Sequence, residues 1–202
     1  AVPTRAERSA TERGIFRDPD AAQPCIDYYA YTSWLTADAI LCLARAVKEH
    51  AGPDRVVGTF YGYTLQLFGQ RQQNAGHLAL RQLWESPCID FVCSPSSYAF
   101  RDVGGRGTSH IMSLLGGLQL HGKLWFSETD IRTSLTEVAS GMWGRPDTVE
   151  EDCLQQDKEL GRILAQGIAH WWFDVGRIRY DHPILMDRIA GWCAAADRAL
   201  DA

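Results

Sequence analysis

Four short apolar runs, each followed by polar or aromatic residues, most strongly constrain the fold of this chain. The runs begin near residues 56, 89, 123 and 168, so roughly 33 to 45 residues separate their starts. Each interval contains a helical pattern, and a parallel crossover between strands requires such a helix. The runs are apolar throughout, which is typical of strands that are covered on both faces. The pattern therefore predicts an α/β fold with about four parallel strands and flanking helices.

Local signals place the ends of the predicted domain. Residues 1–32 lack hydrophobic periodicity, so we expect an irregular N-terminal arm followed by one domain over 33–202. Thr148 and Glu151 have the spacing of a capping box, which predicts that a helix begins there. Pro183 lies where it can open the last helix. No glycine-rich phosphate-binding motif follows the first strand, which argues against a nucleotide site.

Composition excludes several classes of function. The net charge is -5, which gives no electrostatic footprint for nucleic acid or for an anionic membrane. No apolar run approaches the ~20 residues that a membrane span needs. The six cysteines have no zinc-ligand spacing, so we expect reduced thiols, no metal and no cofactor. The absence of a signal-peptide pattern predicts the cytoplasm.

The candidate site residues lie just after the strands. Barrel enzymes carry their chemistry at the carboxyl ends of the strands, where the loops gather. Glu128 is the strongest candidate for a reacting group, and Asp130 with Arg132 is expected to form an ion pair that orients its loop. Asp130 and Arg132 are also expected to contact substrate, as are the remaining candidates: Tyr61, Tyr63, Ser97, Tyr98, Trp172 and Asp174.

Adjacent residues on the last strand must face opposite ways. Trp171 and Trp172 therefore divide between the core and the strand-end mouth, and Trp172 is favoured for the mouth because it shares parity with Asp174. A mouth tryptophan can stack on the face of a sugar ring. We expect His170 to be an interior residue. No nucleophile-elbow motif surrounds Ser97, so a serine nucleophile is the weaker alternative.

Several segments resemble a known family. They read VVGTFYGY at 56–63, GHLALR at 76–81, IDF followed by SPSSY within 89–98, and HGKLWFSETDIRT at 121–133. These segments resemble the C-terminal half of a bacterial (β/α)-barrel glycosidase, similar to the beta-galactosidase-like enzymes related to glycoside hydrolase family 42 in clan A. The resemblance implies that Glu128 is the retaining nucleophile, that the four strands correspond to the fifth to eighth of the barrel, and that the substrate is a β-galactoside-like sugar or oligosaccharide.

The chain departs from that family in one important respect. No strand precedes the helix near 34–50, so the segment that should carry the acid/base of the family is absent. Four strands cannot close a barrel, and open edges expose unpaired backbone groups. We therefore expect a truncated TIM-type half-barrel, which is completed by a second copy in a homodimer or belongs with a missing N-terminal half.

Two further functions fit the same strand-end mouth. The first is ester hydrolysis by Ser97 or by a carboxylate with a nearby histidine, because activated esters need no strong acid for departure of the leaving group. The second is a non-catalytic role, in which the truncated barrel serves as a binding or assembly module.

Overall fold

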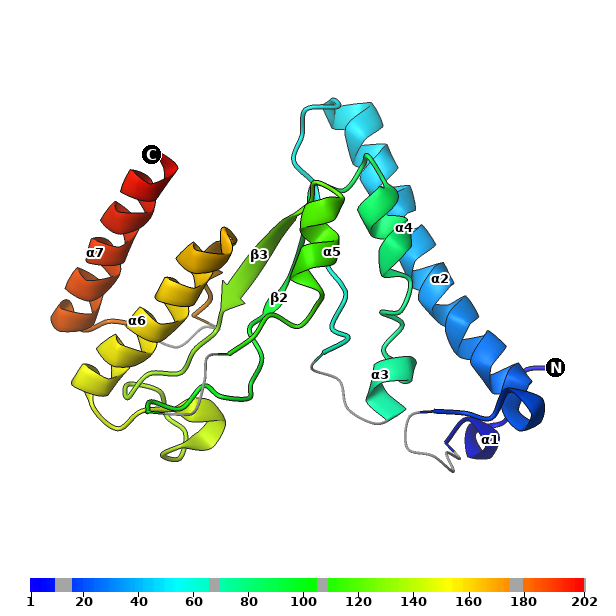
Figure 1. Ribbon diagram of the computed structural model, residues 1–202, viewed down its shortest axis with the longest axis horizontal. Helices are drawn as coiled ribbons and strands as arrows, with labels where there is room; N and C mark the ends of the chain where they lie inside the picture. Colours follow the sequence, from blue (N-terminus) through cyan, green and yellow to red (C-terminus); the bar gives the residue numbers. More distant parts are fainter. Residues whose placement is uncertain (10–15, 66–69, 105–108, 175–179, 202) are drawn as a thin grey trace. The chain divides into compact units, whose positions relative to one another are not determined.

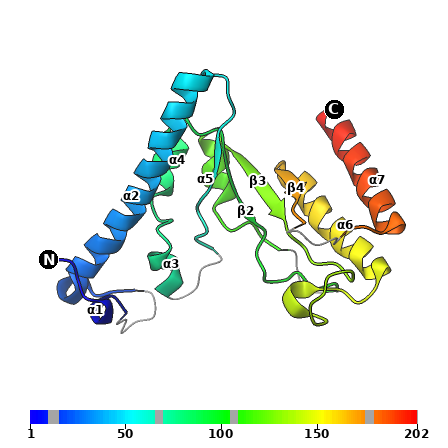
Figure 2. The same ribbon diagram turned by 180° about the vertical axis from the view of Figure 1, so that it is seen from behind.

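In a computed structural model the chain is an α/β protein with one parallel four-stranded sheet in the order β1-β2-β3-β4, flanked by helices (Figures 1 and 2). The strands are β1 (Gly58–Phe60), β2 (Phe91–Pro95), β3 (Leu124–Thr129) and β4 (Ala169–Trp172). This confirms the predicted fold class. The structure describes residues 1–9, 16–65, 70–104, 109–174 and 180–201.

The chain divides into two compact units. Unit 1 comprises residues 1–94 and 112–125, and unit 2 comprises residues 95–111 and 126–202. Each unit consists of two segments that are separated in sequence, so neither unit is continuous.

Unit 1 is built on a long helix and the first strand pair. Its helices are α1 (Arg5–Ser9), α2 (Pro19–Ala51), α3 (Gln70–Asn74), α4 (Leu80–Glu85) and α5 (Leu115–Leu120). Strands β1 and β2 pair in parallel, with Gly58 opposite Phe91. A Cβ on Gly58 would lie 2.1 Å from the Phe91 ring, so a larger residue there would force that ring to move. Leu83, Val92 and Leu118 lie in the core without exposed surface.

Helix α2 begins much earlier than the sequence pattern predicts. The prediction of an irregular arm is wrong for residues 19–32, which belong to α2. Asp18 caps the helix, because its side chain accepts a hydrogen bond at 3.0 Å from the backbone N–H two residues later. Pro24 lacks an N–H, and the backbone at Ala22 is not helical (φ -126°, ψ 17°). The proline therefore accompanies a kink and does not end the helix.

Unit 2 packs helices α6 (Val149–Gln166) and α7 (Pro183–Leu200) against each other, and a short 3-10 turn, η1 (Met142–Gly144), precedes them. Both predicted helix starts are confirmed. The Thr148 side chain accepts a hydrogen bond from the Glu151 backbone N–H at 3.2 Å, and Pro183 occupies the first turn of α7. The core between the two helices contains Cys153, Tyr180, Leu185 and Ile189, with Val149 and Trp172 packed against it.

The helices and the cysteines of the described residue ranges each have a property that bears on function. None of their helices combines the length and the apolar character needed to cross a membrane. All six cysteines are free thiols, and Cys42 and Cys193 are exposed.

Candidate functional site

Strand β3 brings Glu128 to its carboxyl end. Side chains alternate along a strand, so Phe126 and Glu128 share one face of the sheet while Ser127 and Thr129 point to the other. Glu128 is paired in register with Trp171 of β4, and its side chain is 8% exposed. The carboxylate is therefore held on a rigid element, in a place where water reaches only a small part of it.

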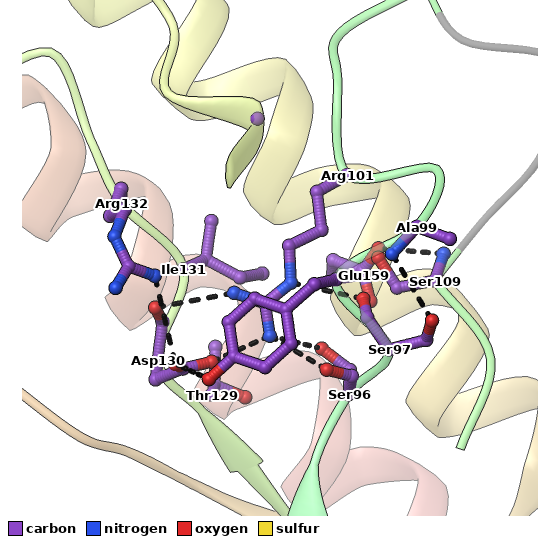
Figure 3. A network of polar contacts seen from close by, with 12 residues as sticks. Ser96, Ser97, Ala99, Arg101, Ser109, Thr129, Asp130, Ile131, Arg132 and Glu159 are labelled. Atoms are coloured by element: carbon purple, nitrogen blue, oxygen red, sulfur yellow. Dashed lines mark hydrogen bonds and ion pairs between the residues drawn. The ribbon is translucent and has the colours of Figure 1, made fainter. Parts of the chain in front are cut away.

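Asp130, directly after β3, is held by a buried arginine (Figure 3). The Arg101 side chain has no exposed surface, and its Nη2 lies 2.6 Å from Asp130 Oδ1. The same guanidinium donates to the carbonyl oxygens of Ser96 at 2.7 Å and Ser97 at 3.0 Å. A buried charge needs such complete pairing to be tolerated. Arg101 is not among the site residues that the sequence pattern predicts.

The second carboxylate oxygen of Asp130 is also engaged. The Tyr98 hydroxyl donates to Oδ2 at 2.9 Å, and the Tyr98 ring lies 4.0 Å from the Arg101 guanidinium. Arg132 Nη1 lies 3.7 Å from Oδ2, so the expected ion pair with Asp130 is present. The Arg132 guanidinium also lies over the Trp143 ring at 4.1 Å. These contacts make Asp130 a group that positions the loop.

The Glu128 carboxylate is different. Within the described part of the chain, no residue forms a hydrogen bond to it. Burial raises the pKa of the Glu128 carboxyl above its ordinary value, the charge on Asp130 raises it further, and Arg101 lowers it. The Glu128 carboxyl is therefore buried and free to contact a bound molecule. The neighbouring Asp130, in contrast, is paired with arginine.

A glycine and a glutamine pack the Arg101 segment against η1 and α6. Gly144 has a φ of +78°, and a Cβ there would lie 2.4 Å from the Cβ of Arg101. Gln155 Nε2 donates to the carbonyl oxygens of Arg101 at 2.5 Å and Gly144 at 2.9 Å. The backbone around Arg101 is therefore packed on both sides.

Helix α6 presents a buried polar face to the loops. Glu159 accepts the Ser109 N–H at 3.2 Å and pairs with Arg162 at 3.4 Å. Asp152 accepts the Ser134 N–H at 2.7 Å and its hydroxyl at 2.6 Å. A signal for this face exists in the sequence, because the buried polar residues recur every three or four positions, at Asp152, Gln155, Gln156, Glu159 and Arg162.

The two tryptophans of β4 are placed oppositely to the expectation. Trp171 stands opposite Glu128 in the register, and its ring lies 5.0 Å from the Phe126 ring. Trp172 donates its indole N–H to Gln156 of α6 at 3.1 Å and packs against the core between α6 and α7. The assignment of Trp172 to the mouth is therefore wrong, because α6 covers its face of the sheet. Asp174 lies two residues after β4 and is half-buried.

Of the two tyrosines predicted to follow the first strand, Tyr61 is a structural residue of unit 1. It has no exposed surface, and its hydroxyl donates to the Gly76 carbonyl at 2.9 Å and accepts the Ala79 N–H at 3.1 Å. Its assignment to substrate binding is wrong, because these backbone contacts occupy the hydroxyl. Tyr63 is half-buried, and its N–H donates to His77 Nδ1 at 3.1 Å.

Ser97, the alternative nucleophile, forms part of a turn. Its side chain has no exposed surface, and its hydroxyl accepts the Ala99 N–H at 3.1 Å. Such a bond is typical of a serine that stabilises a loop. The loop is the one that positions Tyr98 and Arg101.

His170 is an interior residue, as expected. Its Nδ1 lies 3.4 Å from the Thr129 hydroxyl, and its ring meets the Trp172 ring at 4.4 Å. Burial, assisted by the charge of Arg162, lowers the pKa of His170 from 6.5 to about 4. The imidazole is therefore neutral in the folded chain at neutral pH.

We expect this histidine to weaken the fold in acid. Between pH 6.5 and about 4 the unfolded chain binds a proton at His170 and the folded chain does not, so the free energy of unfolding falls as the pH falls through this window. Urea titrations measure the free energy of unfolding at neutral pH and at pH ~4.5. The decrease between the two should be smaller in His170→Gln than in the wild type by on the order of 2 kcal/mol. Identical pH dependence in the two proteins would contradict the buried neutral state.

Comparison with protein families, with curated proteins and with solved structures finds no match to this chain. Among the described residues, no group of three or more His, Cys, Asp or Glu side chains is placed to hold a metal ion.

Proposed function

We propose that Glu128 is the nucleophile of a retaining glycoside hydrolase that acts on a β-galactoside-like substrate. The observation that carries this proposal is a buried carboxylate without a hydrogen-bond partner in the described part of the chain, at the carboxyl end of a parallel strand. Structural carboxylates nearby are paired, as Asp130 and Glu159 are. Leaving a buried carboxyl unpaired costs stability, and such costs are typical of reacting groups.

The chemistry proceeds in two displacements. A Glu128 oxygen attacks the anomeric carbon, the bond from that carbon to the leaving oxygen breaks, and a glycosyl ester forms. Water then attacks the same carbon, the ester bond breaks, and the water proton passes to a base. Glu128 must be ionised for the first step. Because its pKa is raised, we expect the acid limb of activity to lie at a higher pH than for an ordinary glutamate.

The reaction on natural substrates requires a second carboxyl. Retaining enzymes place it about 5–5.5 Å from the nucleophile, where it protonates the leaving oxygen. In this proposal the second carboxyl comes from another copy of the chain or from a preceding half of the barrel. A very acidic phenol leaves an aryl glycoside as the phenolate, without protonation. Turnover of such a glycoside therefore reports on Glu128 alone.

The contacts of Ser97 favour this function over ester hydrolysis by a serine. An attacking hydroxyl needs access to substrate, whereas the Ser97 side chain is buried and accepts a backbone N–H. Turnover of a nitrophenyl ester that is lost in Ser97→Ala and retained in Glu128→Gln would reverse this preference. Failure of both esters and glycosides would support the non-catalytic role.

The proposal is tested by trapping the covalent intermediate. The substrate is a dinitrophenyl β-galactoside with fluorine in place of the hydroxyl next to the anomeric carbon, which slows the second displacement more than the first. We expect one glycosyl group per chain, carried by the peptide that contains Glu128 and found by mass spectrometry. A label on Asp130 or on another peptide would show that Glu128 is not the nucleophile.

An available buried carboxylate should also cost stability. We expect Glu128→Gln to raise the free energy of unfolding at neutral pH by about 0.5–2 kcal/mol, because the amide keeps the shape and removes the buried charge. Glu159→Gln is the matched control, and it should destabilise because the buried Arg162 loses the carboxylate of its ion pair. Urea unfolding measures both. A loss of stability in Glu128→Gln would indicate that the carboxylate is a structural group.

A further inference from the structure

Helix α2 of unit 1 has two apolar faces. One face packs into the unit, where α4 lies beside the helix (Figure 1), and its buried residues include Tyr29, Ser33, Ala37 and Ala44. The opposite face is exposed and also carries large apolar side chains: Tyr31 (64% exposed), Leu35 (53%) and Leu43 (70%). A helix on the surface of a protein ordinarily has one apolar stripe and is polar on the other side. The second apolar face therefore indicates that another surface covers it.

Small and apolar residues form a line along this outer face. They are Leu35, Ala39, Cys42 and Ala46, and the intervals between them alternate between four and three residues. Apolar residues at this spacing are typical of helices that pack side by side. Ala39 and Cys42 are exposed, and Ala46 is half-buried. Their small side chains allow a second helix to approach closely. We call these four residues the α2 seam.

Two exposed charges lie along one edge of the α2 seam. Asp38 directly precedes Ala39, and Arg45 directly precedes Ala46. The two charges are therefore two helical turns apart on the same edge. Charges that flank the seam of a helix pair form ion pairs with the partner and set its orientation. An aspartate and an arginine at this spacing make the edge complementary to a reversed copy of itself.

Twofold symmetry determines which residues meet in such a pair. An axis that lies between two antiparallel helices, perpendicular to both, brings the same edge of each helix together. Placing Ala39 against Cys42 of the second copy then brings Asp38 beside Arg45 of that copy. The symmetry repeats every contact, because residue i meets residue j and residue j meets residue i. Two ion pairs therefore flank the seam, and no like charges meet there.

A parallel pair of the same helices would not match these charges. Its twofold axis runs along the helices, so the charged edge of one copy meets the opposite edge of the other. That opposite edge carries the exposed apolar residue Leu43. Asp38 would lose water there without gaining a partner, which costs free energy. The charge pattern therefore favours an antiparallel arrangement, with a second copy of this chain as the occupant of the face.

We propose that the α2 seam is an interface between two copies of this chain, with Asp38 of each copy paired to Arg45 of the other. The seam is short compared with an interface of standard size, so we expect a reversible dimer with a dissociation constant of about 1–100 μM. The interface is built from unit 1 alone and does not depend on the chemistry at Glu128. Its test requires no substrate, so the proposed function can fail without affecting it.

Charge reversal tests the pairing. Sedimentation equilibrium of the full chain measures the dissociation constant at concentrations from about 1 to 300 μM. Asp38→Arg should raise that constant by at least about tenfold, because it places two pairs of like charges together. Arg45→Asp should have the same effect. An equimolar mixture of the two variants should form a heterodimer of wild-type strength, because each variant supplies the charge that the other needs.

Asp197→Arg is the matched control for the change of charge. It makes the same substitution at an exposed position of another helix, α7, and should leave the dissociation constant unchanged. Pairing in the mixture also excludes misfolding as the cause of the weaker association in the single variants, because misfolded chains would not associate at wild-type strength.

Crosslinking tests whether the contact lies at the α2 seam. Cys193→Ser removes the other exposed thiol, and a short bismaleimide should then join two chains through Cys42. Adding Cys42→Ser should abolish this crosslink. A wild-type chain that stays monomeric at about 300 μM would overturn the proposal. A dimer that neither charge reversal weakens would overturn it as well, because its contact would lie elsewhere.

Discussion

Replacing Glu128 with alanine is expected to lower the turnover of a dinitrophenyl β-galactoside by at least about a thousandfold. The leaving phenolate needs no proton, so the loss isolates the nucleophilic step from any missing acid. The substitution also removes a buried charge, and for this reason the variant should remain folded. Glu49→Ala, which removes an exposed carboxylate from α2, is the control and should leave turnover unchanged.

Azide distinguishes the role of nucleophile from that of acid/base. In Glu128→Ala the small anion enters the vacated space and attacks the anomeric carbon once, so we expect recovery of turnover and an α-galactosyl azide. An acid/base variant would give the β-azide, because the enzyme nucleophile has already inverted the centre once. The raised pKa of Glu128 is a property that acids also use, so this stereochemistry is the decisive readout. A β-product would assign Glu128 to the acid/base role.

Replacing Arg101 with methionine is expected to lower the free energy of unfolding by about 3–5 kcal/mol. The guanidinium is completely buried, and its loss removes the 2.6 Å ion pair to Oδ1 of the buried Asp130 carboxylate. The carbonyl oxygens of Ser96 and Ser97 lose their donor as well. Urea unfolding measures the change. A loss below about 1 kcal/mol would show that the pair contributes little.

Two further variants separate charge from geometry at this position. Arg101→Lys keeps the charge but has no planar fork for two carbonyls and a carboxylate, so an intermediate loss is expected. The double variant Arg101→Met with Asp130→Leu removes both charges together. It should be more stable than Arg101→Met alone, because the buried Asp130 carboxylate is not left without its buried arginine.

The strands and the later helices were predictable because their signals are local. Continuous apolar runs separated by helical intervals predicted the parallel sheet. Thr148 and Pro183 marked the starts of α6 and α7 because caps act within one turn of their own helix. The presence of Glu128 at the end of a strand followed from the same local pattern. The early start of α2 was not predicted, because a proline such as Pro24 is also typical of an irregular segment.

The partners of the candidate site were not predictable. Arg101 lies 29 residues from Asp130 in sequence, in a segment without periodicity, and only the folded loops bring the two together. Trp171 and Trp172 differ by parity, which divides them between two faces without saying which face a helix covers. Packing of α6 against the Trp172 face decided that question.

Hydrophobic patterns and helix caps act within a few residues. The amino-acid sequence alone therefore establishes the α/β class, the strand ends and the carboxylate at position 128. Burial and charge pairing depend on segments that are distant along the chain. Folding alone therefore decides that Arg101 matches Asp130, that Glu128 keeps a raised pKa without a partner in the described chain, and that Tyr61 belongs to the core.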